Sequence, residues 1–170
     1  MRTFTKIESE VGEFYLVAQN KKLQAIHIGE EDFLRIEEVA SLKEDPNDEL
    51  LVECKRQLRQ YFAGERTTFN LPIAQTGTEF QISVWNSLLE IPFGATKSYQ
   101  EVANMIGRPK AVRAVGQANK ANKFPIIVPC HRVIGKNQTL TGYAGSRVEI
   151  KDWLLKIEGA AFKHNGNKEN

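Results

Sequence analysis

Residues 98–122 read SYQEVANMIGRPKAVRAVGQANKAN, and they decide the fold of the second half of the chain. Ser98, followed three positions later by Glu101, has the spacing of a capping box and predicts a short helix. Gly107 and the proline two positions after it predict a turn, and residues 110–122 have the composition of another helix. Two short helices joined by a turn that contains glycine predict a helix-turn-helix.

The second helix of this pair is basic and rich in small side chains. Its cations are Lys110, Arg113 and Lys120, and its small residues are Ala111, Ala114, Gly116, Ala118 and Ala121. A mid-helix glycine costs about 1 kcal/mol relative to alanine, so Gly116 needs a structural reason. Small residues would let the helix backbone approach DNA, with Arg113 long enough to reach into the base stack. They would equally allow close packing of helices, and the sequence leaves both interpretations open.

The first half of the chain has a different pattern. The segments TFTKI, GEFYLVA and LQAIHI within residues 1–28 alternate or cluster apolar residues, which predicts an antiparallel β-meander. A charged amphipathic stretch covers residues 30–42. Asp48 is a candidate N-cap for a helix that stops near Gly64, and Cys54 lies in the apolar stripe of that helix, where we expect a small buried hydrophobe.

The two patterns predict two domains. Residues 65–77 lack periodicity and are expected to form a linker, and Thr78 with Gln81 begins a further helix with a capping box. We therefore expect an α/β domain with its linker over residues 1–76 and a mainly α-helical domain that carries the helix-turn-helix over residues 77–162. Residues 163–170 form a polar tail.

Composition and charge narrow the class of protein. The chain has 170 residues, of which 41% are apolar and 26% charged, as in an ordinary soluble protein, and it has no apolar run long enough for a membrane span. The start of the chain does not resemble a secretory signal, and two cysteines cannot form a disulfide framework, so we expect a cytoplasmic protein. Residues 97–147 contain nine Lys and Arg but one acid, Glu101, which indicates either a polyanion-binding surface or a solvated basic face.

The segment FPIIVPCHRVIGKN, residues 124–137, is the strongest candidate for chemistry. Pro125 and Pro129 stiffen the backbone and hold Cys130 rigidly. A thiol needs a neighbouring base or positive charge to become a useful nucleophile, and His131 and Arg132 offer both. On an extended backbone adjacent side chains point apart, so His131 would act on Cys130 through a water or a turn.

The residues alone leave two interpretations of Cys130. It is a structural residue of a DNA-binding regulator, or the nucleophile of a cysteine hydrolase paired with His131. The hydrolase would turn over many times, and it leaves the basic helix pair unexplained. The regulator would still bind duplex DNA after the substitution Cys130→Ala.

Several motifs in order resemble the methylated-DNA–protein-cysteine methyltransferases, which repair O6-alkylguanine. The matching stretches are Pro129-Cys130-His131-Arg132-Val133, Ser98-Tyr99-Gln100, residues 109–116, Asn122, residues 142–145 and residues 153–159. They span about residues 78–160. The first half of the chain resembles the family only in general plan, and the resemblance implies a ribonuclease H-like fold there and a winged-helix-like fold in the second half.

The resemblance also implies site roles. Cys130 would accept the alkyl group, His131 would be a water-linked base, Glu158 would orient His131, and Asn122 would tie this network to the backbone. Arg113 would fill the gap left in the DNA stack by a flipped nucleotide, while Ala114 and Gly116 would face the minor groove. Tyr99, the Val133 main chain, Tyr143 and Ala144 would form the pocket for the base.

Transfer to a thiol makes a thioether, so the resemblance implies a DNA-repair transferase that is consumed in a single turnover. It implies double-stranded DNA as partner, no membrane association, a monomer and no cofactor. Some relatives hold zinc in the first domain, but residues 1–76 contain one cysteine and one histidine, too few for a tetrahedral site, and we predict no metal.

Overall fold

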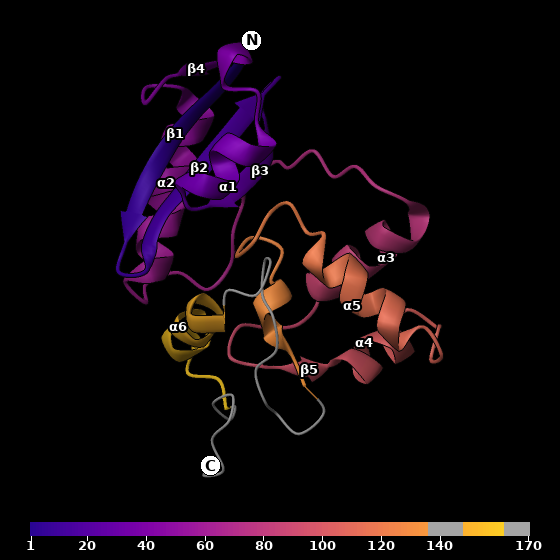
Figure 1. Cartoon of the computed structure of the whole chain (residues 1–170). Coiled ribbons are helices and arrows are strands. Elements are labelled where there is room, and N and C mark those ends of the chain that lie inside the picture. The colour runs from indigo at the N-terminus through magenta and orange to yellow at the C-terminus, as the bar shows by residue number, and fades with distance from the viewer. Residues whose placement is uncertain (136–147, 162–170) are drawn as a thin grey trace. The chain divides into compact units, whose positions relative to one another are not determined.

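The computed structural model describes residues 1–135 and 148–161 (Figure 1). The chain divides into two compact units, Met1–Gln75 and Thr76–Asn170, which are described separately below. The first unit is α/β and the second is mainly helical, which confirms the predicted fold class. No helix within the described ranges is long and apolar enough to span a bilayer.

A four-stranded sheet of order β3-β2-β1-β4 forms the centre of the first unit. Strands β1 (Arg2–Ser9), β2 (Gly12–Gln19) and β3 (Lys22–Ile28) are antiparallel, so the predicted meander is confirmed. Asn20 and Lys21 connect β2 to β3 with φ values of 54° and 62°, the left-handed backbone that a two-residue hairpin turn requires. The short strand β4 (Leu42–Glu44) pairs with β1 in parallel and was not predicted.

Helices cover both faces of this sheet. Neighbouring side chains of a strand point to opposite faces, and Phe14 meets Phe62 of α2 (Glu49–Phe62) while Tyr15 stacks on Phe33 of α1 (Glu30–Ile36). A 3-10 turn, η1 (Val39–Ser41), follows α1. Asp48 caps α2 as predicted. Cys54 is fully buried in that helix, and burial raises its pKa to about 12, so this thiol is inert.

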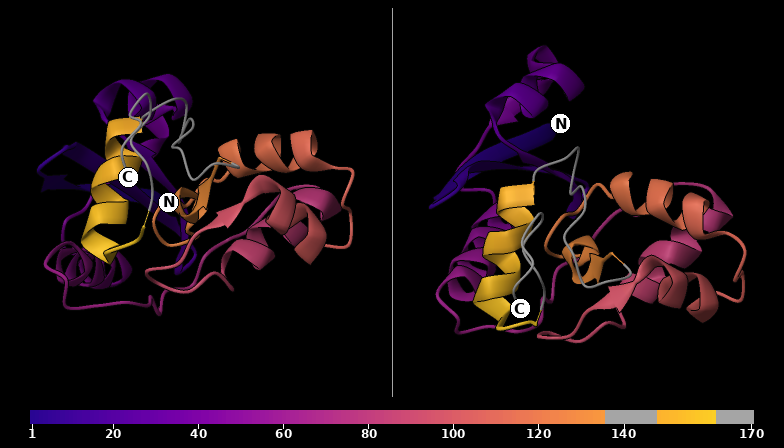
Figure 2. Two further views of the ribbon diagram at one scale, coloured as in Figure 1. Left: turned by 90° about the horizontal axis from the view of Figure 1, so that it is seen from below. Right: turned by 60° about the horizontal axis from the view of Figure 1, so that its bottom comes forward.

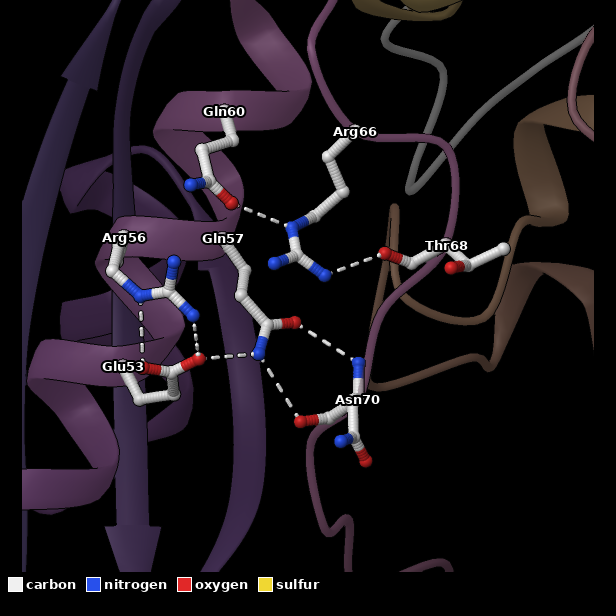
Figure 3. A network of polar contacts seen from close by, with 7 residues as sticks. All are labelled: Glu53, Arg56, Gln57, Gln60, Arg66, Thr68 and Asn70. Atoms are coloured by element: carbon white, nitrogen blue, oxygen red, sulfur yellow. Dashed lines mark hydrogen bonds and ion pairs between the residues drawn. The ribbon is translucent and has the colours of Figure 1, made fainter.

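Part of the segment expected to be a linker makes hydrogen bonds with α2 and β3. Gln57 accepts a hydrogen bond from the Asn70 amide at 2.9 Å and donates one to the Asn70 carbonyl at 3.2 Å (Figure 3). Arg66 donates to Gln60 of the same helix at 2.8 Å, and Ile73 forms a bridge to Leu23 of β3. The side-chain amide of Gln57 supplies the backbone hydrogen bonds that a neighbouring strand would otherwise supply. The segment is therefore ordered without the alternation of apolar residues that is typical of a strand.

The second unit consists mainly of helices, with a short 3-10 turn between the last two of them. In order, its elements are α3 (Glu79–Leu88), β5 (Lys97–Ser98), α4 (Tyr99–Met105), α5 (Val112–Lys120), η2 (Cys130–Arg132), β6 (Val133–Ile134) and α6 (Val148–Glu158). Both predicted capping boxes are present, at Thr78 and Ser98. Strands β5 and β6 pair in parallel, and η2 lies between α5 and α6 in every view (Figures 1 and 2).

Candidate active site and nucleic-acid interface

Two consecutive tight turns lead into Cys130, the first residue of η2. The Val128 amide donates to the Phe124 carbonyl at 2.8 Å across a turn in which Ile126 has a φ of 79°. The Cys130 amide then donates to the Val128 carbonyl at 2.7 Å, and Pro129 between them has φ −80° and ψ 66°, an inverse γ-turn. The proline ring presets that φ, so the stiffening expected from the sequence has a defined geometry.

Ile126 is the conformational exception of this segment. A β-branched residue in the left-handed region is a genuine outlier, at a cost of about 1–2 kcal/mol. Ile126 is 1% exposed, so burial of its side chain offsets the backbone strain. Strain of this kind persists where the surrounding packing over-determines the backbone, as it does at many functional sites.

Two asparagines hold Cys130, which is 2% exposed. Asn122 Nδ2 lies 3.2 Å from Cys130 Sγ and donates to the Val128 carbonyl at 2.8 Å, while its Oδ1 accepts from the Phe124 amide at 3.0 Å. Asn119 Nδ2 donates to the Cys130 carbonyl at 3.3 Å. Asn122 was expected here, but Asn119 was not, although it lies only three positions earlier, on the buried face of α5.

The candidate base is fully buried beside an acid. His131 Nε2 lies 2.7 Å from Glu158 Oε2, and Glu158 is the last residue of α6. A carboxylate at a helix C-terminus opposes the helix dipole and so needs a cationic or hydrogen-bonding partner. The pairing of His131 with Glu158, inferred from the sequence only through the resemblance, is present in the structure.

Arg132 binds the same carboxylate, that of Glu158, and the sequence did not predict this contact. Its Nε donates to Glu158 Oε1 at 2.9 Å and its Nη2 to Glu158 Oε2 at 3.0 Å, a two-pronged ion pair in the interior. Nη1 donates to the Ile91 carbonyl at 2.6 Å. We expected Arg132 to supply positive charge near Cys130, but its guanidinium forms an ion pair with Glu158 instead.

The cation that acts on Cys130 is Lys151 of α6. Lys151 is fully buried, and its Nζ donates to the Val133 carbonyl at 2.6 Å. Burial raises the pKa of Cys130 to about 11, and the charge of Lys151 opposes that rise. Burial also lowers the pKa of Lys151 to about 8. Ile150, Leu154, Leu155 and Glu158 are buried on α6 too, so Lys151 falls on the face that periodicity marks as internal.

Burial also has the largest effect on the pKa of His131, the candidate base. It lowers the pKa of His131, with Glu158 opposing the shift and the charges of Arg132 and Lys151 adding to it. His131 is therefore a neutral imidazole near pH 7. A neutral imidazole has one nitrogen lone pair and can take a proton from a thiol.

Helix α5 buries one face and exposes another. Val115, Ala118 and Asn119 are buried, and Trp85 of α3 donates to the Ala118 carbonyl at 2.8 Å. Arg113 and Ala114 are exposed, and a Cβ added to Gly116 would meet no atom within 4 Å. Close helix packing therefore explains Ala118 but not Ala114 or Gly116. Arg108, Lys110 and Lys120 add exposed positive charge around this face.

The remaining expected site residues lie in two groups. Tyr99 is the first residue of α4, partly buried, and Val133 is buried in β6, where its backbone pairs with Lys97. Tyr143 and Ala144 lie outside the described residues, as does the polar tail 163–170. Within the described ranges no cluster of three or more His, Cys, Asp or Glu side chains is placed to hold a metal ion.

Comparisons with known protein families match both units. Residues 3–75 match the model of the 6-O-methylguanine DNA methyltransferase ribonuclease-like domain. Residues 79–160 match the model of the 6-O-methylguanine DNA methyltransferase DNA binding domain.

Individual relatives span nearly the whole chain. The constitutive methylated-DNA–protein-cysteine methyltransferase of Bacillus subtilis is 48% identical over 163 residues, which cover 96% of this chain and 99% of the relative. The crystal structure of the Mycobacterium tuberculosis O6-methylguanine methyltransferase superposes with a TM-score of 0.83 at 40% identity, covering 94% of this chain and 93% of that one. A structure of that organism's OGT in complex with DNA gives a TM-score of 0.82 at 40% identity, with 92% of each chain covered.

Proposed function

The chain belongs to the methylated-DNA–protein-cysteine methyltransferase family, and from that membership we propose that Cys130 is the residue that accepts the alkyl group. The protein is a DNA-repair methyltransferase that binds DNA and transfers the methyl group of O6-methylguanine irreversibly to one of its own cysteines. Of its two cysteines, Cys54 is an inert core residue. Cys130 contacts Asn122 and precedes the buried pair of His131 and Glu158.

The proposed reaction is a direct displacement at the methyl carbon. His131 takes the thiol proton of Cys130 through a bridging water, and the resulting thiolate attacks the methyl group. The sulfur–carbon bond forms as the carbon–oxygen bond breaks, and the bonding electron pair leaves with O6 of guanine, which the proton on His131 then neutralises. Glu158 orients His131, and Asn122 holds the sulfur and its backbone.

The product is a thioether, which thiol exchange does not reverse. One protein molecule therefore repairs one base and needs no cofactor. The cysteine hydrolase considered above would instead turn over many times, so the stoichiometry separates the two.

We further propose how the exposed face of α5 meets double-stranded DNA. Ala114 and Gly116 let the helix backbone approach the minor groove, and Arg113 enters the stack where the damaged nucleotide is flipped out. Tyr99, the Val133 main chain, Tyr143 and Ala144 would surround the flipped base. The exposed Arg113 and the open space at Gly116 support this arrangement. A monomeric state and a cytoplasmic location stay predictions.

The observation that carries the assignment of the acceptor is the 3.2 Å contact between Asn122 Nδ2 and Cys130 Sγ. The residue after Cys130 is His131, which is buried and paired with Glu158. The test is intact-protein mass and peptide mapping after incubation with an O6-methylguanine duplex. We expect one methyl group per protein, on Cys130.

Two serine substitutions make this test specific. Cys130→Ser should abolish methyl uptake while duplex binding persists, and the matched control Cys54→Ser should keep full uptake. Retained uptake in Cys130→Ser would overturn the assignment. Bound DNA without methyl uptake in the unaltered protein would favour the DNA-binding regulator.

A further inference from the structure

One buried carboxylate, that of Glu158, serves two cationic or potentially cationic partners. Arg132 contacts both of its oxygens, at 2.9 and 3.0 Å, and His131 Nε2 lies 2.7 Å from Oε2. Arg132 is 7% exposed, Glu158 5% and His131 0%. The three groups are therefore a desolvated cluster in which the net charge matters far more than it does at the surface.

Charge balance favours one protonation state of this cluster. With Arg132 charged and Glu158 ionised, a neutral His131 leaves the cluster neutral. A protonated His131 would put two cations on one carboxylate, and the charge of Lys151 of α6 would add to the repulsion. Burying an uncompensated charge is costly, so the neutral imidazole is the state that the cluster accommodates.

We propose that Arg132 is a positioning residue for methyl transfer: it clamps Glu158 and balances its charge, so that His131 enters the reaction as a neutral imidazole with its proton on Nε2 and its basic lone pair on Nδ1. The proposal rests on the proposed role of Cys130 as acceptor. In that tautomer Nε2–H donates to Glu158, and Nδ1 is the atom that can take the thiol proton.

Geometry as well as charge ties Arg132 to this role. Its third contact, from Nη1 to the Ile91 carbonyl at 2.6 Å, fixes the guanidinium, and the group lies 5.9 Å from the centre of the Phe93 ring. A planar fork held at three points sets the orientation of the carboxylate, which a lysine ammonium cannot reproduce.

Removing Arg132 should change the pH dependence of methyl transfer rather than its rate alone. The groups that act on His131 are Glu158 and Lys151 from α6 and Arg132 from η2. Without Arg132, the uncompensated Glu158 would stabilise the imidazolium, and an opposite charge at this range raises a histidine pKa by about 1–3 units. The acid limb of the rate profile then moves to higher pH.

The experiment measures the rate of methyl uptake from an O6-methylguanine duplex between pH 5 and pH 9. In Arg132→Leu the midpoint of the acid limb should rise by about one pH unit or more. The double variant Arg132→Leu/Glu158→Gln, which removes both charges, should return that midpoint to the wild-type value or below. Arg132→Lys, which keeps the charge without the fork, should lower the rate but hold the midpoint near that of the wild type.

A matched control exists in the first unit. Arg56 clamps Glu53 with two contacts, at 2.9 and 2.5 Å, on the exposed side of α2 (Figure 3). Arg56→Leu removes the same type of ion pair and should leave the profile unchanged. A uniform loss of rate at every pH in Arg132→Leu, with no shift of the midpoint, would overturn the proposal.

A second measurement keeps the proposal testable if Arg132→Leu does not fold. The ¹⁵N chemical shifts of the His131 ring in the wild-type protein report its protonation and tautomer. A neutral ring protonated on Nε2 at pH 7 is expected, and an imidazolium or the opposite tautomer would refute the proposal. Failure of the wild-type protein to take up methyl would instead overturn the assignment of Cys130, and the ring state would still be measured.

Discussion

Asn119 and Cys130 are joined by a hydrogen bond from Asn119 Nδ2 to the Cys130 carbonyl, at 3.3 Å. Asn119 lies on α5 and Cys130 begins η2, so the helix proposed to contact DNA is fastened directly to the proposed alkyl acceptor. Asn122, just after α5, adds the contact with Sγ. A displacement of α5 on binding DNA would therefore be transmitted to the sulfur and to its backbone.

Asn119→Leu tests that connection. Asn119 Oδ1 is buried and has no hydrogen-bond partner in the described part of the chain, so the change removes one hydrogen bond and also an unsatisfied atom. The free energy of unfolding should change by less than about 1.5 kcal/mol, while methyl transfer slows by up to about tenfold. Ser87→Ala, which removes a buried hydroxyl of α3 bound to the Val84 carbonyl, is the control and should not slow transfer.

Gly116→Ala should separate stability from repair. An added Cβ meets nothing within 4 Å, so the substitution should raise the free energy of unfolding by about 1 kcal/mol through helix propensity. The same methyl group lies on the face proposed to enter the minor groove, so duplex affinity should fall. Thermal unfolding and duplex titration check the two effects, and an unchanged affinity would contradict the proposed contact.

Gly64→Ala is the reference for that experiment. Gly64 follows α2 with a φ of 77°, a conformation that alanine adopts only at a cost. The expected result is lower stability with unchanged duplex affinity, the reverse of the outcome at Gly116.

Arg113→Ala should slow repair of duplex DNA far more than reaction with a free O6-alkylguanine base, because only the duplex requires a flipped nucleotide to be replaced in the stack. Single-turnover rates at saturating duplex measure the effect. Lys120→Ala, on the same helix, should weaken binding in a salt-dependent manner but leave the saturated rate unchanged. Equal losses on both substrates in Arg113→Ala would exclude a role in flipping.

Lys151→Met should slow methyl transfer near pH 7. Removing the buried cation takes away one of the influences that oppose burial and leaves the hydrogen bond from Asn122, so the pKa of Cys130 rises further and less thiolate forms. The loss should shrink as the pH is raised. Lys156→Met is the matched control on α6, since Lys156 is exposed and pairs with Asp152 at 3.1 Å. It should leave the rate unchanged at every pH.

The same variant tests the energetic cost of Lys151. The folded-state pKa of Lys151, about 8, lies below the ordinary value of 10.5, so between these two pH values the unfolded chain holds a proton that the folded protein has released. The contribution of Lys151 to stability therefore rises with pH across that window, by on the order of 3 kcal/mol.

Denaturant unfolding of Lys151→Met and the wild type across this window provides the measurement. The methionine variant should be the more stable protein at pH 7, with an advantage that shrinks towards pH 10. A constant difference at all pH values would show instead that folding does not lower the pKa of Lys151.

Local signals in the sequence predicted much of this fold. The capping boxes at Thr78 and Ser98, the N-cap at Asp48 and the alternation of residues 1–28 each rest on neighbours a few positions apart, and all four are present. The strands β4, β5 and β6 have two or three residues each, too few to show a period, and they form only because distant segments lie beside them.

The candidate site was predictable only in part for the same reason. The motif around Cys130 and its likeness to a known family identified His131, Glu158 and Asn122. The partner of Arg132 is 26 positions away and that of Lys151 is 18 positions away, so neither contact leaves a local signal. A lysine on the apolar face of α6 was the one available hint, because such a residue must be buried or must snorkel to the surface.

Lys151 and Glu158 are both on α6, seven residues apart. Seven residues are close to two full turns of an α-helix, and each residue turns the helix by about 100°. Inserting or deleting a single residue between them would therefore swing one of the two charges away from the cysteine segment. Substitutions at the exposed Lys156 would preserve this relationship but changes in length would not, and any redesign of the protein must conserve that spacing.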